Sequence, residues 1–191
     1  MPHLGESMRR VNAREFHQAI AKGKNSSNSW MVDVHSVREY RKMKCYLSAS
    51  GNAGVAIKRN GDVVSVFSSA KGSNAMGKLI PFAVEMGGKK LDCFANGRNG
   101  GLASMYARYG ARATGRVAFN TEYAPDGWDG KSYPDVVAMV LPKSVDDVIN
   151  KYDPKRSVNV NRLKEYDDYD EMINARDRRM TGDRALGMVS G

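Results

Sequence analysis

Three short apolar segments in the first half of the chain are joined by turn sequences, and this arrangement constrains the fold more than any other feature. The segments are KCYLSA (44–49), AGVAIK (53–58) and DVVSVFS (62–68). SGN joins the first two segments, and RNGD joins the second two. Asn-Gly between runs of β-branched residues is a strong signal for a hairpin. We therefore predict an antiparallel meander over residues 44–68.

Helical and strand periodicities surround this meander. Before it, the pattern predicts helices at 11–23, with Phe16, Ala19 and Ile20 on one face, and at 32–43. After it, a helical pattern runs from Met76 to Gly87, and Pro81 means that this helix either kinks or begins later than its periodicity implies. The remaining predicted elements are a strand at 91–95, a helix at 99–109 with Asn99 as its N-cap and Gly110 at its end, a strand at 111–119 and a strand at 135–142.

The net charge of +9 is distributed unevenly along the 191 residues. Lys and Arg exceed Asp and Glu by 12 over residues 1–120, whereas the acidic residues exceed the basic ones by 3 over residues 121–191. A basic surface of this size attracts polyanions, and it equally attracts a phosphorylated cofactor. Charge alone leaves these partners open, together with a surface that is merely solvated. Nucleic acid, if bound, should meet the basic residues before 120.

The segment 143–191 is predicted to form a charged C-terminal extension after a domain at 1–142. KSVDDVINKYD begins as an amphipathic helix, which Pro154 interrupts. NRLKEYDDYDEMINARDRRM then places Leu163, Tyr166, Tyr169, Met172 and Ile173 near one helical face. We therefore expect a helix docked on the domain, on a partner or on a second copy of the chain. A flexible end is expected from Thr181. A solvated, partly disordered extension is the alternative.

Two local patterns and the order of elements over residues 11–142 resemble the GNAT superfamily of acyl-CoA N-acyltransferases. KGSNAMGKLI (71–80) is similar to the family's pyrophosphate loop, although Asn74 and Met76 stand where the family has glycines. NGGLASMYARYGA (99–111) is similar to the family pattern N-x-x-A-x-x-L-Y-x-x-x-G-F, with Ala111 replacing the final Phe. The resemblance implies an α/β (α+β) fold with a mixed, mostly antiparallel central sheet flanked by helices.

The same resemblance implies a site for acetyl-CoA as co-substrate. Tyr106 would protonate the departing thiolate of coenzyme A, and Asn99 would lie near the pantetheine arm. The residues expected to contact the cofactor are Phe67, Ser68, Lys71, Gly72, Ser73, Asn74, Ala75, Met76 and Asn99. For a base that deprotonates the acceptor amine, Asp33, His35, Glu39 and Glu122 are candidates, and water is an alternative.

Two classes of function stay open from the sequence. The first is an N-acetyltransferase that acts on an amine, either a small molecule or a protein. The second is a catalytically inactive GNAT-like protein that binds nucleic acid or a macromolecular partner, since degenerate proteins of this kind resemble bacteriophage proteins, some of them virion-associated. No metal site is expected, because Cys45 and Cys93 lie apart and outside any Cys/His motif. A chain with no apolar run of membrane-spanning length and no signal peptide at its start is expected in the cytoplasm, or in a virion if it is phage-encoded.

Overall fold

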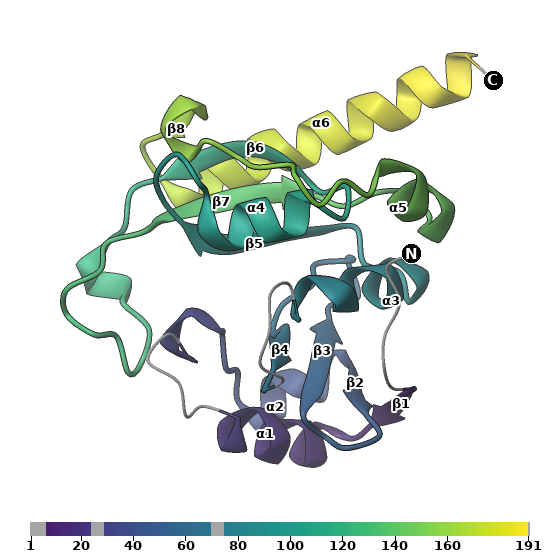
Figure 1. The fold of residues 1–191 in the computed structure, drawn as a ribbon, viewed down its shortest axis with the longest axis vertical. Helices are drawn as coiled ribbons and strands as arrows, with labels where there is room; N and C mark the ends of the chain where they lie inside the picture. Colours follow the sequence, from purple (N-terminus) through teal and green to yellow (C-terminus); the bar gives the residue numbers. More distant parts are fainter. Residues whose placement is uncertain (1–6, 24–28, 70–74, 191) are drawn as a thin grey trace.

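Two four-stranded sheets form the frame of the protein (Figure 1). The computed structural model describes residues 7–23, 29–69 and 75–190, and it describes side chains as far as residue 182. The strand orders are β1-β2-β3-β4 and β5-β7-β6-β8, and neighbouring strands are antiparallel except for β6 and β8. The predicted α/β class with mostly antiparallel sheets flanked by helices is confirmed.

The first sheet contains the predicted meander. Its strands are β1 (Met8–Val11), β2 (Lys44–Ser48), β3 (Ala53–Ile57) and β4 (Phe67–Ser68). Strand β1 was not predicted, because Arg9 and Arg10 obscure its alternation of apolar and polar residues. Charged side chains of this kind are typical of an edge strand. The regular part of β4 is much shorter than the predicted strand at 62–68.

Helices α1 (Ala13–Lys22) and α2 (Val37–Tyr40) cover one face of this sheet (Figure 1). The side chain of Asn12 accepts a hydrogen bond from the Glu15 amide at 2.8 Å and so begins α1. The helix predicted at 32–43 is wrong in its extent. Ser36 and Glu39 form a capping box that starts α2 only at Val37, so the residues before it form neither helix nor strand.

The second sheet confirms the three strands predicted after the meander. Its members are β5 (Lys90–Ala95), β6 (Arg112–Val117), β7 (Asp135–Val140) and the short β8 (Glu165–Tyr166). On one face lie α3 (Ile80–Glu85), which follows a 3₁₀ turn at Gly77–Leu79, and α4 (Gly101–Ala107). Pro81 lies in the first turn of α3, where its missing amide costs no hydrogen bond, so the helix begins later than its periodicity implies.

The start of α4 differs from the prediction. Its N-cap is Gly100, with a φ of 66°, and Asn99 precedes the cap. A Cβ at Gly100 would collide with the carbonyl of Val158. Ser104 ties the two segments together, because its hydroxyl donates to the Asn99 carbonyl and accepts from the Val158 amide at 2.8 Å. The sequence could not predict this cap, because its partner Val158 lies more than 50 residues later, in an irregular segment.

The C-terminal segment packs against the rest of the chain through α5 (Val145–Lys151) and α6 (Tyr169–Ser190). Helix α6 covers the face of the second sheet opposite α4 (Figure 1), and its Met172 and Arg176 are each 1% exposed. Arg176 Nη1 donates to the Leu91 carbonyl at 2.9 Å. The predicted docking on the domain is therefore confirmed for α6, which carries Tyr169, Met172 and Ile173 of the predicted helical face. Leu163 and Tyr166 lie before this helix, Tyr166 in β8, so the predicted extent of the face is wrong. Helix α6 continues past Thr181 to Ser190, and the flexibility expected from Thr181 stays a prediction.

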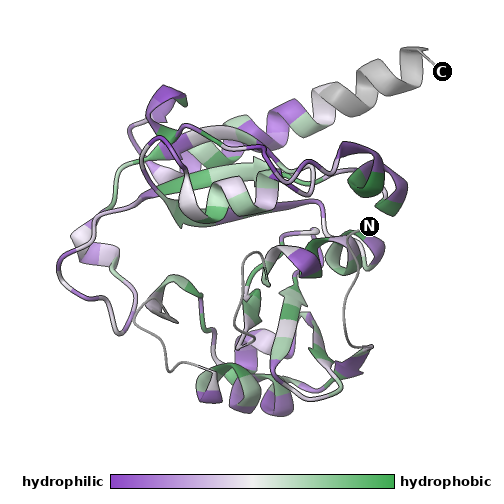
Figure 2. Ribbon diagram, in the orientation of Figure 1, coloured by the Kyte–Doolittle hydropathy of each residue, from purple (hydrophilic) through white to green (hydrophobic). Residues whose placement is uncertain are grey.

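The buried apolar side chains form three clusters. Figure 2 shows how hydrophobic residues are distributed over the sheets and helices. The main core includes Ile57, Leu79, Ile80, Leu91, Ala103, Tyr109, Val137, Met139, Val148 and Val160. A second core between the first sheet and its helices includes Phe16, Ile20, Tyr40, Leu47 and Phe67. Val117, Ala138 and Met172 form a small third core beneath α6. Within the described residues, no helix is long and apolar enough to cross a membrane.

A β-bulge interrupts the strand predicted at 62–68. Ile57 pairs with Val63, and Gly54 pairs with Phe67, so three steps along β3 (57 minus 54) face four steps along the neighbouring segment (67 minus 63). Ser65 lies in the bulge with a φ of 52°, which is rare for a residue other than glycine. Bulges bend and twist the strand that carries the extra residue. The chain therefore turns away from its straight path at Ser65.

Buried hydrogen bonds hold the bulge in place. The Ser65 hydroxyl donates to the Asp33 carbonyl at 2.7 Å and lies 2.8 Å from the Tyr40 hydroxyl. Tyr40 also accepts from the His35 amide at 3.0 Å, and its side chain is 1% exposed. These contacts join α2, the irregular segment at 32–36 and the bulge into one unit. They compensate for the unfavourable backbone conformation at Ser65.

We predict that Tyr40→Phe lowers the free energy of unfolding by about 1–3 kcal/mol, since it leaves a buried amide without its acceptor. Urea denaturation followed by circular dichroism measures this. Tyr46→Phe is the matched control, because Tyr46 is also buried and packs against Phe82 at 5.1 Å between ring centroids. Equal destabilisation by the two substitutions would contradict a role for the Tyr40 hydroxyl in holding the bulge.

Candidate functional site

The chain that carries the bulge (residues 62–66, the bulged segment) pairs with β5 at one position and then separates from it. Asp62 bridges Lys90 in parallel, and the Val63 amide donates to the Lys90 carbonyl at 2.8 Å. In the described part of the chain, no backbone hydrogen bond joins the two beyond Lys90. On its other edge β5 is fully paired with β7. The separation therefore leaves an edge of β5 open toward the bulged segment.

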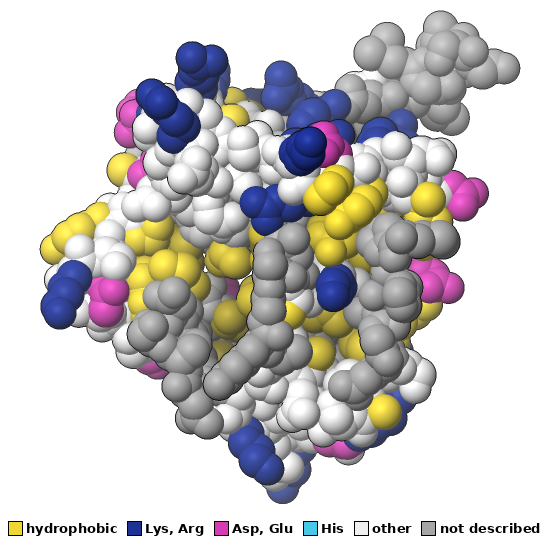
Figure 3. All heavy atoms as spheres, viewed as in Figure 1, with side chains coloured by type: hydrophobic (Ala, Val, Ile, Leu, Met, Phe, Trp, Pro, Cys, Tyr) yellow, Lys and Arg dark blue, Asp and Glu magenta, His cyan; other side chains and the backbone are white. Residues whose placement is uncertain are grey.

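A cavity of about 770 Å³ occupies this opening. Its walls come from the bulged segment at 63–66, from β5 at 91–94, from the segment at 31–33 and from the residues that follow β6 at 117–120. Met76, Leu102 and Tyr106 close it on the side of α4, and residues 167–170 close it at the start of α6. Figure 3 shows hydrophobic side chains gathered in the hollow between the two sheets.

Tyr106 lines this cavity from α4 and is 4% exposed. Burial, reinforced by the neighbouring Cys93 thiol, raises the pKa of Tyr106 well above its ordinary value. The hydroxyl therefore stays protonated at any physiological pH and can donate a hydrogen bond. The acid role that the sequence resemblance implies for Tyr106 stays a prediction.

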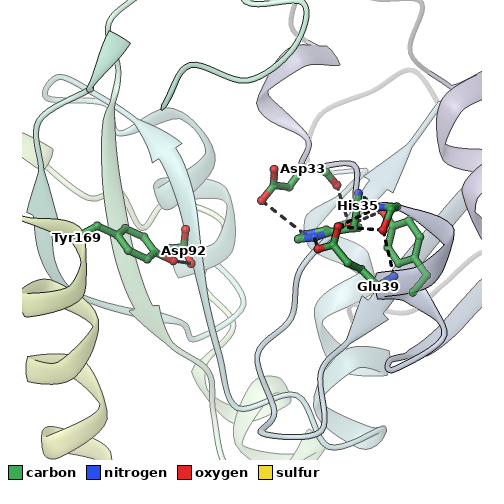
Figure 4. Close-up of polar contacts among 8 residues, drawn as sticks. Asp33, His35, Glu39, Asp92 and Tyr169 are labelled. Carbon is green, nitrogen blue, oxygen red and sulfur yellow. Dashed lines mark hydrogen bonds and ion pairs between the residues drawn. The ribbon is translucent and has the colours of Figure 1, made fainter. Parts of the chain in front are cut away.

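Asp92 lines the cavity from the other face of β5, because side chains of successive strand residues point to opposite faces and Cys93 points toward Tyr106. Burial, reinforced by the nearby Asp62, raises the pKa of the Asp92 carboxyl to about 6, while the Tyr169 hydroxyl opposes this rise by donating to Asp92 Oδ1 at 3.1 Å. Figure 4 shows Tyr169 of α6 reaching this carboxylate. A carboxyl with a pKa near neutrality is suited to general acid–base catalysis.

Sequence reasoning missed Asp92 and Tyr169. The available signal was a charged residue inside the apolar strand LDCFA, flanked on both sides by residues that are buried. Its partner Tyr169 lies 77 positions later, in a segment predicted to be an extension. No local pattern connects them, so their pairing depends on how α6 docks.

Three of the four predicted candidates for the base, Asp33, His35 and Glu39, lie close together across from Asp92 (Figure 4). His35 Nδ1 lies 2.9 Å from Glu39 Oε2, and His35 Nε2 lies 3.7 Å from Asp33 Oδ2. Hydrogen bonds from His35 and from Ser36 lower the pKa of Glu39 to about 2. Asp33 lines the cavity, whereas His35 and Glu39 are not among its lining residues. Glu122 is exposed in the 3₁₀ turn Thr121–Tyr123.

The residues predicted to bind the cofactor are dispersed. Met76 lines the cavity, and Phe67 is buried in the second core, where its ring packs against Phe16 at 5.8 Å. Ser68, Ala75 and Asn99 are not among the lining residues. Lys71, Gly72, Ser73 and Asn74 lie outside the described residues. Among the described residues, no group of three or more His, Cys, Asp or Glu side chains could hold a metal ion.

Comparison with known proteins shows a distant likeness to a solved structure. No protein-family model matches the chain, and no curated protein matches it. Among solved structures, the chain is similar to one described as a "putative phosphinothricin N-acetyltransferase", with 18% sequence identity and a TM-score of 0.47. The match covers 72% of this chain and 98% of the other. A likeness at this level establishes neither the family nor the substrate of this protein.

We predict that Asp92→Asn changes the pH dependence of stability. A carboxyl whose pKa is raised on folding favours the folded state at low pH and loses that contribution as the pH rises toward the folded pKa, here between about 4 and 6. The variant should therefore gain roughly 1–2 kcal/mol over the wild type between pH 4 and pH 7. Urea denaturation at both pH values measures this difference, and Asp146→Asn, at an exposed site in α5, should show no such gain. A pH-independent difference for Asp92→Asn would contradict a raised pKa.

Proposed function

We propose that the protein is an N-acetyltransferase that transfers the acetyl group of acetyl-CoA to an amine. The separation of the bulged segment from β5 supports this most directly. An acyl-pantetheine chain is narrow, extended and rich in amides, so it can take the place of a missing strand between them. The open edge of β5 offers backbone hydrogen-bonding groups, and the apolar lining suits the methylene groups of the chain. Acetyl-CoA supplies the thioester that makes the acetyl group transferable.

The proposed acid Tyr106 and the proposed base Asp92 lie on opposite faces of β5. The acceptor enters as an ammonium ion and gives one proton to the Asp92 carboxylate, which is ionised above a pH of about 6. The neutral nitrogen then attacks the thioester carbonyl, so that a C–N bond forms and the C–S bond breaks. The nitrogen is positively charged after the attack and releases its second proton to solvent. Tyr106 protonates the departing thiolate and regains a proton from solvent, and Asp92 returns its proton to solvent. Tyr169 is a positioning residue in this scheme, because it holds Asp92 by a hydrogen bond.

We propose that the phosphates of the cofactor bind to the segment that resembles the pyrophosphate loop, through Lys71, Gly72, Ser73, Asn74 and Ala75. Met76 follows these residues directly and lines the cavity, so the proposed phosphate contacts and the proposed pantetheine path are adjacent in the chain. Phe67, Ser68 and Asn99 remain proposed contacts.

We predict that Tyr106→Phe lowers kcat for acetyl transfer about 10²-fold and leaves the affinity for acetyl-CoA unchanged within about twofold. Release of the CoA thiol with a panel of primary amines measures turnover, and titration calorimetry measures affinity. Tyr109→Phe is the control, because Tyr109 is also buried next to α4 but packs against Tyr152 and is not a lining residue. Full activity of a folded Tyr106→Phe variant would remove Tyr106 from the mechanism, and no acetyl-CoA binding at millimolar concentration would remove the enzymatic function.

A second candidate function is binding of a polyanion such as nucleic acid, and a second groove favours it. This groove, of about 1220 Å³, lies at the C-terminal ends of α3 and α4 beside α5. Its lining includes one carboxylate, Asp147, and the basic residues Lys89, Arg112, Lys143, Lys151, Arg156 and Arg162. Only Lys89 and Arg112 come from the part of the chain before residue 120.

If nucleic acid binds there, Lys143→Gln combined with Lys151→Gln should weaken binding of a labelled DNA oligonucleotide about tenfold at 50 mM salt and flatten the salt dependence. Fluorescence anisotropy measures both quantities. Lys42→Gln combined with Lys44→Gln removes two exposed charges at the start of β2 and in the turn before it, and serves as the control. Equal weakening by both pairs would show attraction to net charge rather than to the groove.

A further inference from the structure

We infer that the acceptor taken by the cavity is an aliphatic amine with two ammonium groups. This inference rests on the proposed acetyl transfer, and it specifies the class of acceptor. It depends on two independent features of the cavity lining: the sign of its charges and its aromatic wall.

The charges that line the cavity all have one sign. Five aspartates contribute to the lining, and among the described residues no Lys, Arg or His does: Asp33, Asp92, Asp167, Asp168 and Asp170. This is unusual in a chain with 30 basic and 21 acidic residues. A hollow of one sign attracts ligands of the opposite sign and repels those of its own. An acceptor that carries a carboxylate or a phosphonate would find no cation among these residues.

Only part of this charge can be explained by local structure. Asp168 Oδ1 accepts from the Glu171 amide at 2.8 Å, and acidic residues such as Asp170 are favourable in the first turn of α6. Asp33 and Asp92 do not lie at a helix N-terminus, because they come from the 31–33 wall and from β5; Asp33 Oδ2 lies 3.7 Å from His35 Nε2. Asp92 would face the reacting ammonium group. Asp33 on the opposite wall and Asp167 beside α6 are then available to a second one.

An aromatic wall stands beside these carboxylates. Phe94 and Phe119 line the cavity, with 5.9 Å between their ring centroids, and Trp30 packs against both at 5.4 and 6.3 Å. Trp128 continues the cluster, 5.2 Å from Phe119. Aromatic faces attract organic cations and pack against the methylene groups that separate them. Carboxylates next to aromatic rings therefore suit a diamine better than a compact inorganic cation, which aromatic rings would not help to hold.

The test uses 1,5-diaminopentane, with pentylamine and glutamate as comparison ligands, and needs no acetyl-CoA. Trp30 and Trp128 are the two tryptophans of the chain, so intrinsic fluorescence reports on this cluster. We expect 1,5-diaminopentane to bind at least tenfold more tightly than pentylamine, and glutamate not to bind. Added NaCl should weaken the diamine more than the monoamine.

The variant Asp33→Asn with Asp167→Asn should lower the affinity for the diamine about tenfold and that for pentylamine about twofold or less. Asp146→Asn with Asp147→Asn is the matched control, since it removes two carboxylates from α5, away from the cavity, and should change both affinities less than twofold. Equal binding of diamine and monoamine, equal effects of the two double variants, or no diamine binding by fluorescence and calorimetry at millimolar concentration would each overturn the inference.

The two proposals fail separately. Binding of the diamine without binding of acetyl-CoA would support the cationic ligand and contradict the acetyl transfer. Binding of acetyl-CoA and transfer of acetyl groups to monoamines, with no preference for the diamine, would support the enzymatic function and contradict the proposed class of acceptor.

Discussion

The bulge at Ser65, held by the hydroxyl of Tyr40 and the carbonyl of Asp33, is the constraint on which the cavity depends. One extra residue in a strand turns the chain aside just after its bridge to β5 at Lys90. Without that turn, the two strands could continue to pair, and the space between them would close. The same hydrogen bonds fix the wall at 31–33, so one small network shapes two sides of the site.

Helix α6 completes the site from the far end of the chain. Arg176 is 1% exposed and donates to the carbonyl of Leu91, and the neighbouring Asp177 pairs with Lys90 at 3.1 Å. These charge-assisted contacts hold α6 against β5, and burying a guanidinium is favourable only with such partners. The docked helix then presents Tyr169 to Asp92. The proposed base therefore depends on a segment that local sequence patterns describe only as a charged extension.

Much of the frame followed from the sequence, because local periodicity and turn chemistry determine it. RNGD located the hairpin between β3 and β4, and the apolar periodicity located α1, α4 and the docked α6. The missing parts are long-range. Hydrogen bonds to Tyr40 and Asp33 stabilise the left-handed backbone at Ser65. The base candidate Asp92 is recognised by its burial and by its hydrogen bond from Tyr169, and no sequence motif contains it. Tyr106 was found through resemblance, since spacing alone predicted no more than a capped helix.

The central claim is that the opening between the bulged segment and β5 holds the acyl-pantetheine chain. A crystal structure of the protein with coenzyme A tests it most directly. Electron density for the pantetheine arm is expected between residues 63–66 and 91–94, with the sulfur between Tyr106 and Asp92. Coenzyme A bound only in the basic groove beside α5, or an arm that avoids the opening, would contradict it.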